Sequence, residues 1–333
     1  YGLFFLQLIS VALDIVIYRI KKFKCFQKSY CNSYINMLVY KYSSCKEECK
    51  MKLPFNIDLK NKVCVVTGGT GILCGAMADA LAECGGKIAI LALGQEACDN
   101  KAKEINEKGG TAIGIEANVL DKESLRKAHE IILKEFGPVD ILINGAGGNH
   151  PKGTTTKEYL EVEDLENEDL TTFFDLDPKG VEFVFNLNFL GTLLPSQEFS
   201  KDMINKEGAT IINISSMNAF TPLTKIPAYS GAKAAVSNFT QWLAVHMSKV
   251  GVRVNAIAPG FFVTDQNRKL LFNEDGTATP RTEKILNSTP MRRFGEADEL
   301  IGTLLYLVSQ EASGFVNGVV IPVDGAFSAY SGV

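Results

Sequence analysis

Short apolar runs alternate with helix-like segments along the chain from Lys62 onward. The apolar runs are bounded by glycine, asparagine or charged residues, which is typical of buried strands: Val63–Val66, Ile88–Leu91, Ala112–Glu116, Ile141–Ile143, Thr210–Ile214, Arg253–Ile257 and Val319–Val323. Between them we expect helices over Ala76–Cys84, Glu96–Lys108 and Ser124–Phe136, and another around Phe185–Phe199. Because repeated strand–helix units with apolar strands form parallel sheets, the pattern predicts an α/β fold: a doubly wound parallel sheet with helices on both faces.

One segment interrupts this alternation. Residues Gly153–Gly180 carry the acidic stretch Glu161–Glu166, followed by Phe173-Phe174-Asp175. Two interpretations stay open: the insertion is a lid or substrate loop, or it is a solvated surface loop.

The first 50 residues differ from the rest of the chain. Residues Tyr1–Ile20 are mostly apolar, the basic run Lys21–Lys24 follows, and Met51 stands directly before Lys52-Leu53-Pro54. Three interpretations compete: a membrane anchor, a signal peptide, and a segment that is not part of the working domain. We favour the third, and we expect residues 51–333 to form a single domain that carries the 153–180 insertion.

Composition narrows the class of protein. The chain has 333 residues, 46% of them hydrophobic, which is enough for one large α/β domain or two small ones. A net charge of −4 gives no sign of a nucleic-acid partner. The eight cysteines include no C-x-x-C pair, so we expect no metal site, and Cys64, Cys74, Cys84 and Cys98 fit small reduced thiols.

A glycine-rich turn follows the first predicted strand. The sequence Gly69-Thr70-Gly71-Ile72-Leu73-Cys74 matches G-x-G-x-x-G except that Cys74 holds the third glycine position. Glycines allow the tight turn and the close approach of a pyrophosphate, which binds at the N-terminus of the following helix. The turn therefore predicts dinucleotide binding, against the alternative of a purely structural turn.

A tyrosine and a lysine stand four residues apart in Tyr229-Ser230-Gly231-Ala232-Lys233. On a helix both side chains lie on one face, where the ammonium is expected to lower the pKa of the phenol and suit it to proton transfer at neutral pH. Ser216 follows the strand 210–214, at the edge where open α/β sheets bind ligands. The alternative interpretation of such a pair is a solvated helix face.

Taken in order along the chain, these motifs resemble those of the short-chain dehydrogenase/reductase family. The resemblance covers about Asn56 to the C-terminus and rests on these segments: Thr67–Gly71, Asn144–Gly147, Asn188–Gly191, Ser216, Tyr229 with Lys233, and Pro259-Gly260 with Thr264. It implies a single NAD(P)-binding Rossmann-type catalytic domain that acts on CH-OH groups. It also implies a cytoplasmic homo-oligomer, a tetramer or a dimer.

The resemblance assigns roles to particular residues. Tyr229 is the expected acid/base, and Ser216 is expected to bind the reacting oxygen. Lys233 is expected to lower the tyrosine pKa and hold the nicotinamide ribose, while Asn188 orders a water that relays protons. Besides Tyr229 and Lys233, the expected cofactor contacts are Gly68, Gly69, Thr70, Gly71, Ile72, Leu93, Asn118, Val119, Asn144, Gly145, Ala146, Gly147, Pro259, Gly260 and Thr264.

Two positions depart from the family pattern. Asn118-Val119 replaces Asp-Val near the end of the third strand, and the asparagine keeps a hydrogen-bonding side chain for the adenine. Ala92-Leu93-Gly94, at the end of the second strand, offers neither an acidic residue for the ribose hydroxyls nor a basic one for a 2′-phosphate. Lacking the basic residue, the chain is expected to use NAD, with NADP as the alternative.

Three loops resemble a subgroup of sugar-acid enzymes called D-mannonate oxidoreductase or fructuronate reductase. They are Asn144–Pro151, Ser216–Lys225 and Pro259–Arg268, together with the insertion after His150. A sugar acid needs many hydrogen-bond partners and a cation for its carboxylate. Six residues of these loops are the expected substrate contacts: Asn149, His150, Asn218, Gln266, Asn267 and Arg268.

The expected reaction is hydride transfer between the nicotinamide and a sugar acid, D-fructuronate/D-mannonate first. The alternatives are a related reductase, such as a gluconate 5-dehydrogenase or a 3-oxoacyl-thioester reductase, and a catalytically silent nucleotide-binding scaffold. Trp242 and His246, on the helix that carries Lys233, are expected to pack at a subunit interface. No membrane contact is expected for the catalytic domain.

Overall fold

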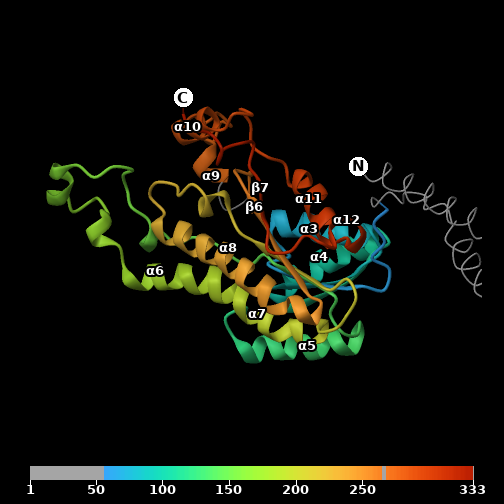
Figure 1. Ribbon diagram of the computed structural model, residues 1–333. Coiled ribbons are helices and arrows are strands. Elements are labelled where there is room, and N and C mark those ends of the chain that lie inside the picture. Colours follow the sequence, from blue (N-terminus) through green and yellow to red (C-terminus); the bar gives the residue numbers. More distant parts are fainter. Residues whose placement is uncertain (1–55, 265–267, 333) are drawn as a thin grey trace, which may run out of the picture. The chain divides into compact units, whose positions relative to one another are not determined.

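Seven parallel strands form the centre of the protein (Figure 1). The computed structural model describes residues 56–264 and 268–332, all within one compact unit. The strands are β1 (Val63–Thr67), β2 (Lys87–Ala92), β3 (Thr111–Glu116), β4 (Ile141–Asn144), β5 (Thr210–Ile214), β6 (Arg253–Pro259) and β7 (Val320–Val323). Their order is β3-β2-β1-β4-β5-β6-β7 and every neighbouring pair is parallel, so the predicted doubly wound, Rossmann-type sheet is confirmed.

Helices connect the strands and cover both faces of the sheet. The α-helices are α3 (Ile72–Glu83), α4 (Gln95–Glu107), α5 (Lys122–Glu135), α6 (Pro178–Phe185), α7 (Gly191–Phe199), α8 (Pro227–Met247), α9 (Arg268–Leu271), α10 (Pro280–Ser288), α11 (Ile301–Val308) and α12 (Gln310–Ser313). Short 3₁₀ turns are η1 (Pro151–Gly153), η2 (Val162–Glu166), η3 (Phe173–Asp175), η5 (Ser200–Met203), η6 (Met217–Ala219), η7 (Ser248–Val250) and η8 (Ala297–Leu300). The segment η4 (Asn186–Leu190) is a π-helix.

Successive side chains along a strand pack into two different hydrophobic cores. Val66 of β1 packs in a core with Leu81 of α3 and Leu304 of α11, whereas Val65 packs in a second core with Leu125 of α5. All five side chains are fully buried, and each such burial contributes about 1.5–3 kcal/mol. Because both faces are covered, the strands are mostly apolar and do not alternate between apolar and polar residues.

The helix predicted around Phe185–Phe199 begins earlier than expected and is interrupted. Asp177 caps α6 by accepting a hydrogen bond from the amide of Lys179, and the π-helical segment η4 joins α6 to α7. The side chain of Asn188, within η4, donates to the carbonyl oxygen of Val184 (2.8 Å). A π-helical turn places one extra residue in the helix, and it commonly marks a functional position.

The predicted insertion forms an arm that projects from the sheet domain (Figure 1, green). Thr156 and Thr171 close its neck: the Thr156 amide donates to the Thr171 carbonyl (2.8 Å), and the Thr171 amide donates to the Thr156 hydroxyl (2.9 Å). Beyond the neck, the Lys157 ammonium pairs with the buried Asp164 carboxylate at 2.8 Å. The arm is thus ordered by its own contacts, and its use as a lid stays a prediction.

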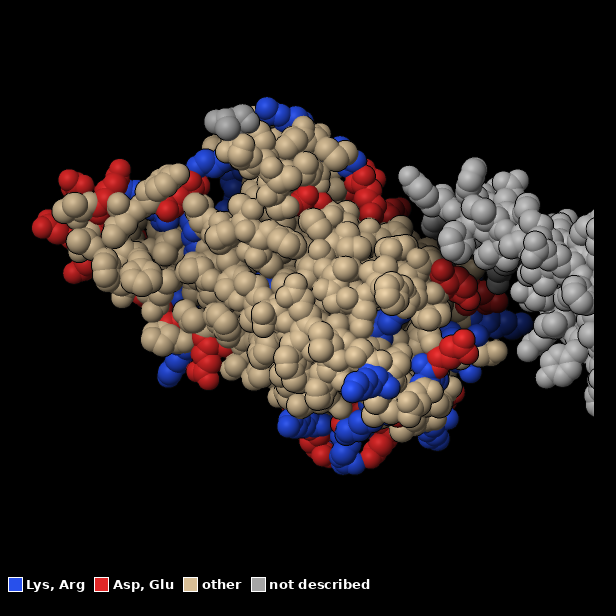
Figure 2. Space-filling view, viewed as in Figure 1, with Lys and Arg blue, Asp and Glu red and all other residues tan. Residues whose placement is uncertain are grey.

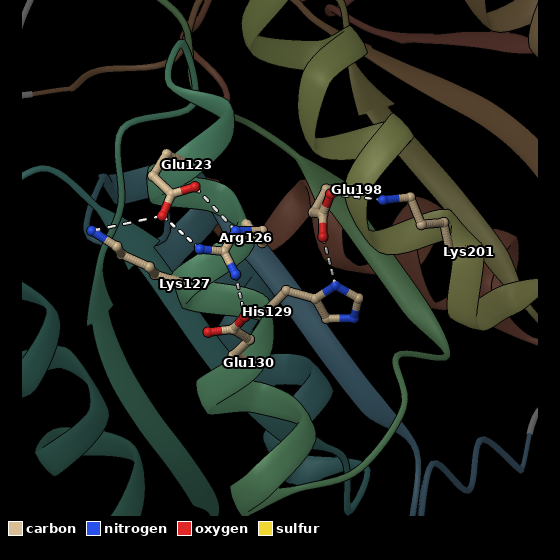
Figure 3. Close-up of polar contacts among 7 residues, drawn as sticks. All are labelled: Glu123, Arg126, Lys127, His129, Glu130, Glu198 and Lys201. Carbon is tan, nitrogen blue, oxygen red and sulfur yellow. Dashed lines mark hydrogen bonds and ion pairs between the residues drawn. The ribbon is translucent and has the colours of Figure 1, made fainter.

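A buried histidine joins α5 to the end of α7 (Figure 3). Nδ1 of His129 lies 2.9 Å from Glu198, and Nε2 lies 2.8 Å from Asp202, which also accepts a hydrogen bond from the amide of Val139. The two ring nitrogens thus link α5 both to α7 and to η5. Burial raises the pKa of Glu198, but hydrogen bonds from His129 and Lys201 outweigh burial and lower it.

No helix within residues 56–264 and 268–332 combines the length and the apolar character needed to cross a membrane. The features predicted for residues 1–50 lie outside the described residues, as do the predicted substrate contacts Gln266 and Asn267.

Candidate active site

The loops after β1, β4, β5 and β6 surround one cavity of about 560 Å³. Its wall includes these predicted site residues: Gly68, Thr70, Gly71, Ile72, Gly145, Ala146, Gly147, Asn149, Ser216, Tyr229, Lys233, Pro259, Gly260 and Thr264. The phosphate turn and the tyrosine–lysine pair, far apart in the sequence, therefore meet in one space. Ligands of doubly wound sheets bind at this edge.

The turn between β1 and α3 fits a dinucleotide pyrophosphate. Gly68 has φ +67°, and a Cβ added there would lie 3.0 Å from the backbone nitrogen of Ala146. Gly71 is the N-cap residue of α3, and no side chain caps the amides that follow it. Open amides at a helix N-terminus bind anions, so the residues present suit a phosphate group there.

Cys74 packs against the loop that follows β4. The thiol lines the cavity, and a Cβ added to Gly145 would lie 2.1 Å from its sulfur. Burial raises the pKa of the Cys74 thiol to about 11, so it stays protonated at neutral pH. Cysteine at the third glycine position thus requires a glycine at 145.

We expect Gly145→Ala to lower the free energy of unfolding by about 1–3 kcal/mol, because the added methyl overpacks against Cys74. The double variant C74G/G145A should recover part of the loss; the carbonyl of Thr67, 3.0 Å from the same Cβ, limits the recovery. Urea unfolding of both variants, with C74G alone as the control, measures this coupling. Equal losses in the single and double variants would contradict it.

Tyr229 and Lys233 lie together on the first turns of α8, as their spacing predicts. The Lys233 ammonium is 5.7 Å from the centre of the Tyr229 ring, and it donates a hydrogen bond to the carbonyl of Ile214 (2.8 Å). Ser216 begins η6, where its hydroxyl accepts from the amide of Asn218 (3.3 Å), and it also forms a hydrogen bond with Tyr229. The solvated-face interpretation fails for Lys233, which is 4% exposed.

The predicted lowering of the Tyr229 pKa is wrong. Burial raises the pKa of this phenol, and the hydrogen bond with Ser216 offsets only part of the effect. Burial likewise lowers the pKa of Lys233, to about 8. Desolvation disfavours the charged form of both groups, and it is the largest cause of both shifts. Tyr229 is therefore protonated at neutral pH, the form that gives a proton to a carbonyl oxygen.

Asn188 fixes the loop that follows β4. Its amide nitrogen donates to the carbonyl of Gly148 (2.7 Å), and its oxygen accepts from the amide of the same residue (3.2 Å). A Cβ added to Gly147 would lie 2.6 Å from the Asn188 oxygen and 3.2 Å from the Lys233 nitrogen. The loop therefore passes directly between Asn188 and Lys233, and the proton-relaying water assigned to Asn188 stays a prediction.

Five predicted cofactor contacts are not part of the cavity wall: Gly69, Leu93, Asn118, Val119 and Asn144. The side-chain amide of Asn144 donates inside the core to Ser196 and Asn213, at 2.9 Å each. The Asn118 oxygen accepts from the amide of Leu120 (3.0 Å) and shapes the turn after β3.

Among the predicted substrate contacts that the structure describes, only Asn149 lies in the wall. Nδ1 of His150 accepts from the amide of Lys152 (3.2 Å), and the Asn218 oxygen accepts from the amide of Leu223 (3.2 Å). Both side chains therefore form hydrogen bonds with the backbone of their own loops. Arg268 is exposed at the start of α9.

Several wall residues were not predicted: Leu73, Cys74, Gly148, Ile214, Ser215, Phe261 and Phe262. Most of them are next to a predicted residue in the sequence. Their position close to the end of a strand was therefore the signal that could have identified them. Ser215 supports the site, since its hydroxyl lies 2.7 Å from that of Ser237 and donates to the carbonyl of Lys233 (3.1 Å). Within the described residues, no group of three or more His, Cys, Asp or Glu side chains could hold a metal ion.

Known proteins share this sequence and this architecture. Residues 62–275 match the family model described as short chain dehydrogenase. An uncharacterized oxidoreductase of Haemophilus influenzae is 60% identical over 286 residues, which are 86% of this chain and 100% of the relative. The uncharacterized oxidoreductase UxuB of Bacillus subtilis is 52% identical over 281 residues, 84% of this chain and 100% of the relative.

A crystal structure of a proposed D-mannonate oxidoreductase from Haemophilus influenza, with bound NAD, is also similar. It is 59% identical with a TM-score of 0.80, and the match covers 85% of this chain and 100% of that one. The chain therefore belongs to the short chain dehydrogenase family. It is an oxidoreductase of that family with an NAD(P)-type dinucleotide fold.

Proposed function

We propose that the protein transfers a hydride between NAD and a sugar acid, with D-fructuronate and D-mannonate as the substrate pair. The observation that carries the proposal is the single cavity that joins the uncapped N-terminus of α3 to Ser216, Tyr229 and Lys233. The 59% identity to a proposed D-mannonate oxidoreductase with bound NAD supports both the cofactor and the substrate class.

The bound nicotinamide supplies the hydride, and the side chains supply the proton and the geometry. Tyr229, protonated because burial raises its pKa, donates its proton to the keto oxygen of the substrate. Ser216 donates a hydrogen bond to the same oxygen and stabilises its developing charge. Lys233 is buried beside the Gly147 backbone, and its ammonium would hold the ribose hydroxyls of the bound cofactor.

The end of β2 supports NAD rather than NADP. The turn at this end of the strand, Ala92-Leu93-Gly94, contains no lysine or arginine that could pair with a 2′-phosphate. The Glu116 carboxylate accepts a hydrogen bond from the amide of Gln95 at 3.2 Å. A carboxylate at this turn repels a phosphate group.

A homo-oligomer fits the exposed surface of α8. Trp242 is 56% exposed and Val245 is 77% exposed, and Trp242 stacks on His246 at 4.7 Å. Such apolar side chains favour contact with a second copy of the chain. We also propose that residues 51–333 are the catalytic domain and that it works in the cytoplasm, where its free thiols Cys64, Cys74, Cys84 and Cys98 stay reduced.

The test follows NADH absorbance with three substrates: D-fructuronate, 5-keto-D-gluconate and an acetoacetyl thioester. We expect the highest kcat/KM with D-fructuronate and NADH, and a clearly lower value with NADPH. A rate with the thioester alone would favour the 3-oxoacyl reductase alternative. Binding of NADH without turnover of any substrate would favour the scaffold alternative.

A further inference from the structure

Lys225 is a half-buried cation next to the proposed catalytic tyrosine. It stands four residues before Tyr229, in the loop that leads from η6 into α8. Among the described residues its ammonium has no hydrogen-bond or ion-pair partner. Apart from Lys87, whose ammonium lies over the Phe136 ring at 5.9 Å, every other lysine or arginine of residues 56–264 and 268–332 that lacks such a partner is exposed. Lys225 is therefore the one described cation that is partly withdrawn from water without a compensating contact.

Lys225 is not part of the cavity wall, but hydrogen bonds link its loop to that wall. Its carbonyl accepts a hydrogen bond from the amide of Thr155 (2.8 Å), at the base of the arm. The neighbouring Thr154 hydroxyl accepts from the side-chain amide of Asn149 (3.0 Å), and Asn149 lies in the cavity wall. Lys225 is thus linked to the wall through two consecutive residues of the arm, and Tyr229 follows four residues later, in the first turn of α8.

The loop holds Lys225 in a conformation that lysine rarely adopts. Its φ is +72°, in the left-handed region, which is strained for a residue other than glycine and persists only where surrounding contacts impose it. The hydrogen bond from the Thr155 amide to the Lys225 carbonyl holds this conformation on one side of the loop. On the other, the Asn218 side chain binds the amide of Leu223 (3.2 Å). Two contacts thus hold the loop around an otherwise unpaired cation.

The cavity lacks a cation that is free to meet a carboxylate. Lys233 is the only lysine or arginine in the described wall, and its ammonium already donates to the carbonyl of Ile214. A sugar acid carries a full negative charge, and a charge-assisted hydrogen bond is the strongest contact that a side chain can offer it. The N-terminus of α8, which begins at Pro227, adds a favourable partial positive charge.

We propose that Lys225 binds the carboxylate of the substrate and so selects keto acids over neutral ketones, an inference that rests on the proposed sugar-acid function. D-Fructuronate and 5-keto-D-gluconate both carry a ketone and a carboxylate on one six-carbon chain. In this arrangement the ketone meets Tyr229, and the carboxylate reaches Lys225 in the loop that precedes α8. An acetoacetyl thioester has no carboxylate at this position, and fructose has a hydroxymethyl group there.

Lys225→Met tests the proposal through the ratio of two kcat/KM values, one for D-fructuronate and one for fructose. Loss of a charge-assisted hydrogen bond lowers the value for D-fructuronate by about 10- to 100-fold, mainly through KM, and leaves the value for fructose unchanged. Lys225→Arg keeps most of the preference for the acid, and Lys225→Glu abolishes it. The control Lys249→Met removes an exposed, unpaired lysine just beyond the other end of α8.

Affinity for NADH, measured by fluorescence, should be equal in all four variants and the wild type. A Lys225→Met enzyme that keeps the wild-type preference for the acid, or loses activity equally on both substrates, would overturn the proposal. A wild-type enzyme that reduces fructose as well as D-fructuronate would instead refute the sugar-acid function itself. The two failures are therefore distinguishable.

Discussion

Tyr229→Phe should lower kcat by about three orders of magnitude and leave NADH affinity within about twofold of the wild type. The substitution removes only the phenolic oxygen, which carries the transferred proton and the hydrogen bond with Ser216. The ring itself and the packing of α8 are retained. Stopped-flow reduction of D-fructuronate and a fluorescence titration with NADH measure the two quantities separately.

Tyr306→Phe is the matched control, because this half-buried tyrosine lies on α11 and is not part of the cavity wall. The pH dependence of the wild type adds a second check. Since burial raises the pKa of Tyr229, reduction should be insensitive to pH near neutrality, while oxidation, which needs the phenolate, should speed up as pH rises. Turnover by Tyr229→Phe at the wild-type rate would refute the assigned role.

Lys233→Met should abolish activity and yet stabilise the folded protein at pH 7. The pKa of this lysine falls from 10.5 to about 8 on burial, which corresponds to a cost of about 3 kcal/mol for holding the charged ammonium inside the protein. Methionine removes that cost. It also removes the hydrogen bond to the carbonyl of Ile214, and this loss destabilises the folded protein by about 1–2 kcal/mol. We therefore expect a net gain of about 1–2 kcal/mol in the free energy of unfolding.

The gain should shrink as pH rises. Between about pH 8 and 10.5 the unfolded chain holds a proton on Lys233 that the folded chain has released, so the wild type recovers stability through this window. Urea unfolding of both proteins at pH 7 and pH 9.5 measures the difference. A variant that is less stable than the wild type at pH 7, or a difference that does not change with pH, would contradict the buried-ammonium interpretation.

The sheet was predictable because its strands are buried on both faces. The run Thr210–Ile214 has the same bounds in the structure as in the prediction, and the other strands differ by one or two residues at their ends. The carboxyl ends of parallel strands lie at one edge of the sheet, so the loops that follow them meet there. The order of the motifs was therefore enough to place the glycine-rich turn after β1 beside Tyr229.

Side-chain orientation in the loops was not predictable. His150 and Asn218 are polar residues in the expected loops, but both bind loop backbone, and Asn144 points into the core. The π-helical turn at Asn188 spans only five residues, Asn186–Leu190, which is too short a segment for apolar periodicity to reveal. The direction of the Tyr229 pKa shift depends on burial, which a four-residue spacing does not report.

The most direct test of the proposed function is the reduction of D-fructuronate by NADH, with the product identified by chromatography against D-mannonate and its C5 epimer. The account predicts rapid oxidation of NADH, D-mannonate as the product, and no turnover by Tyr229→Phe. Absence of turnover with D-fructuronate, alongside rapid reduction of an uncharged ketone or a thioester, would contradict it.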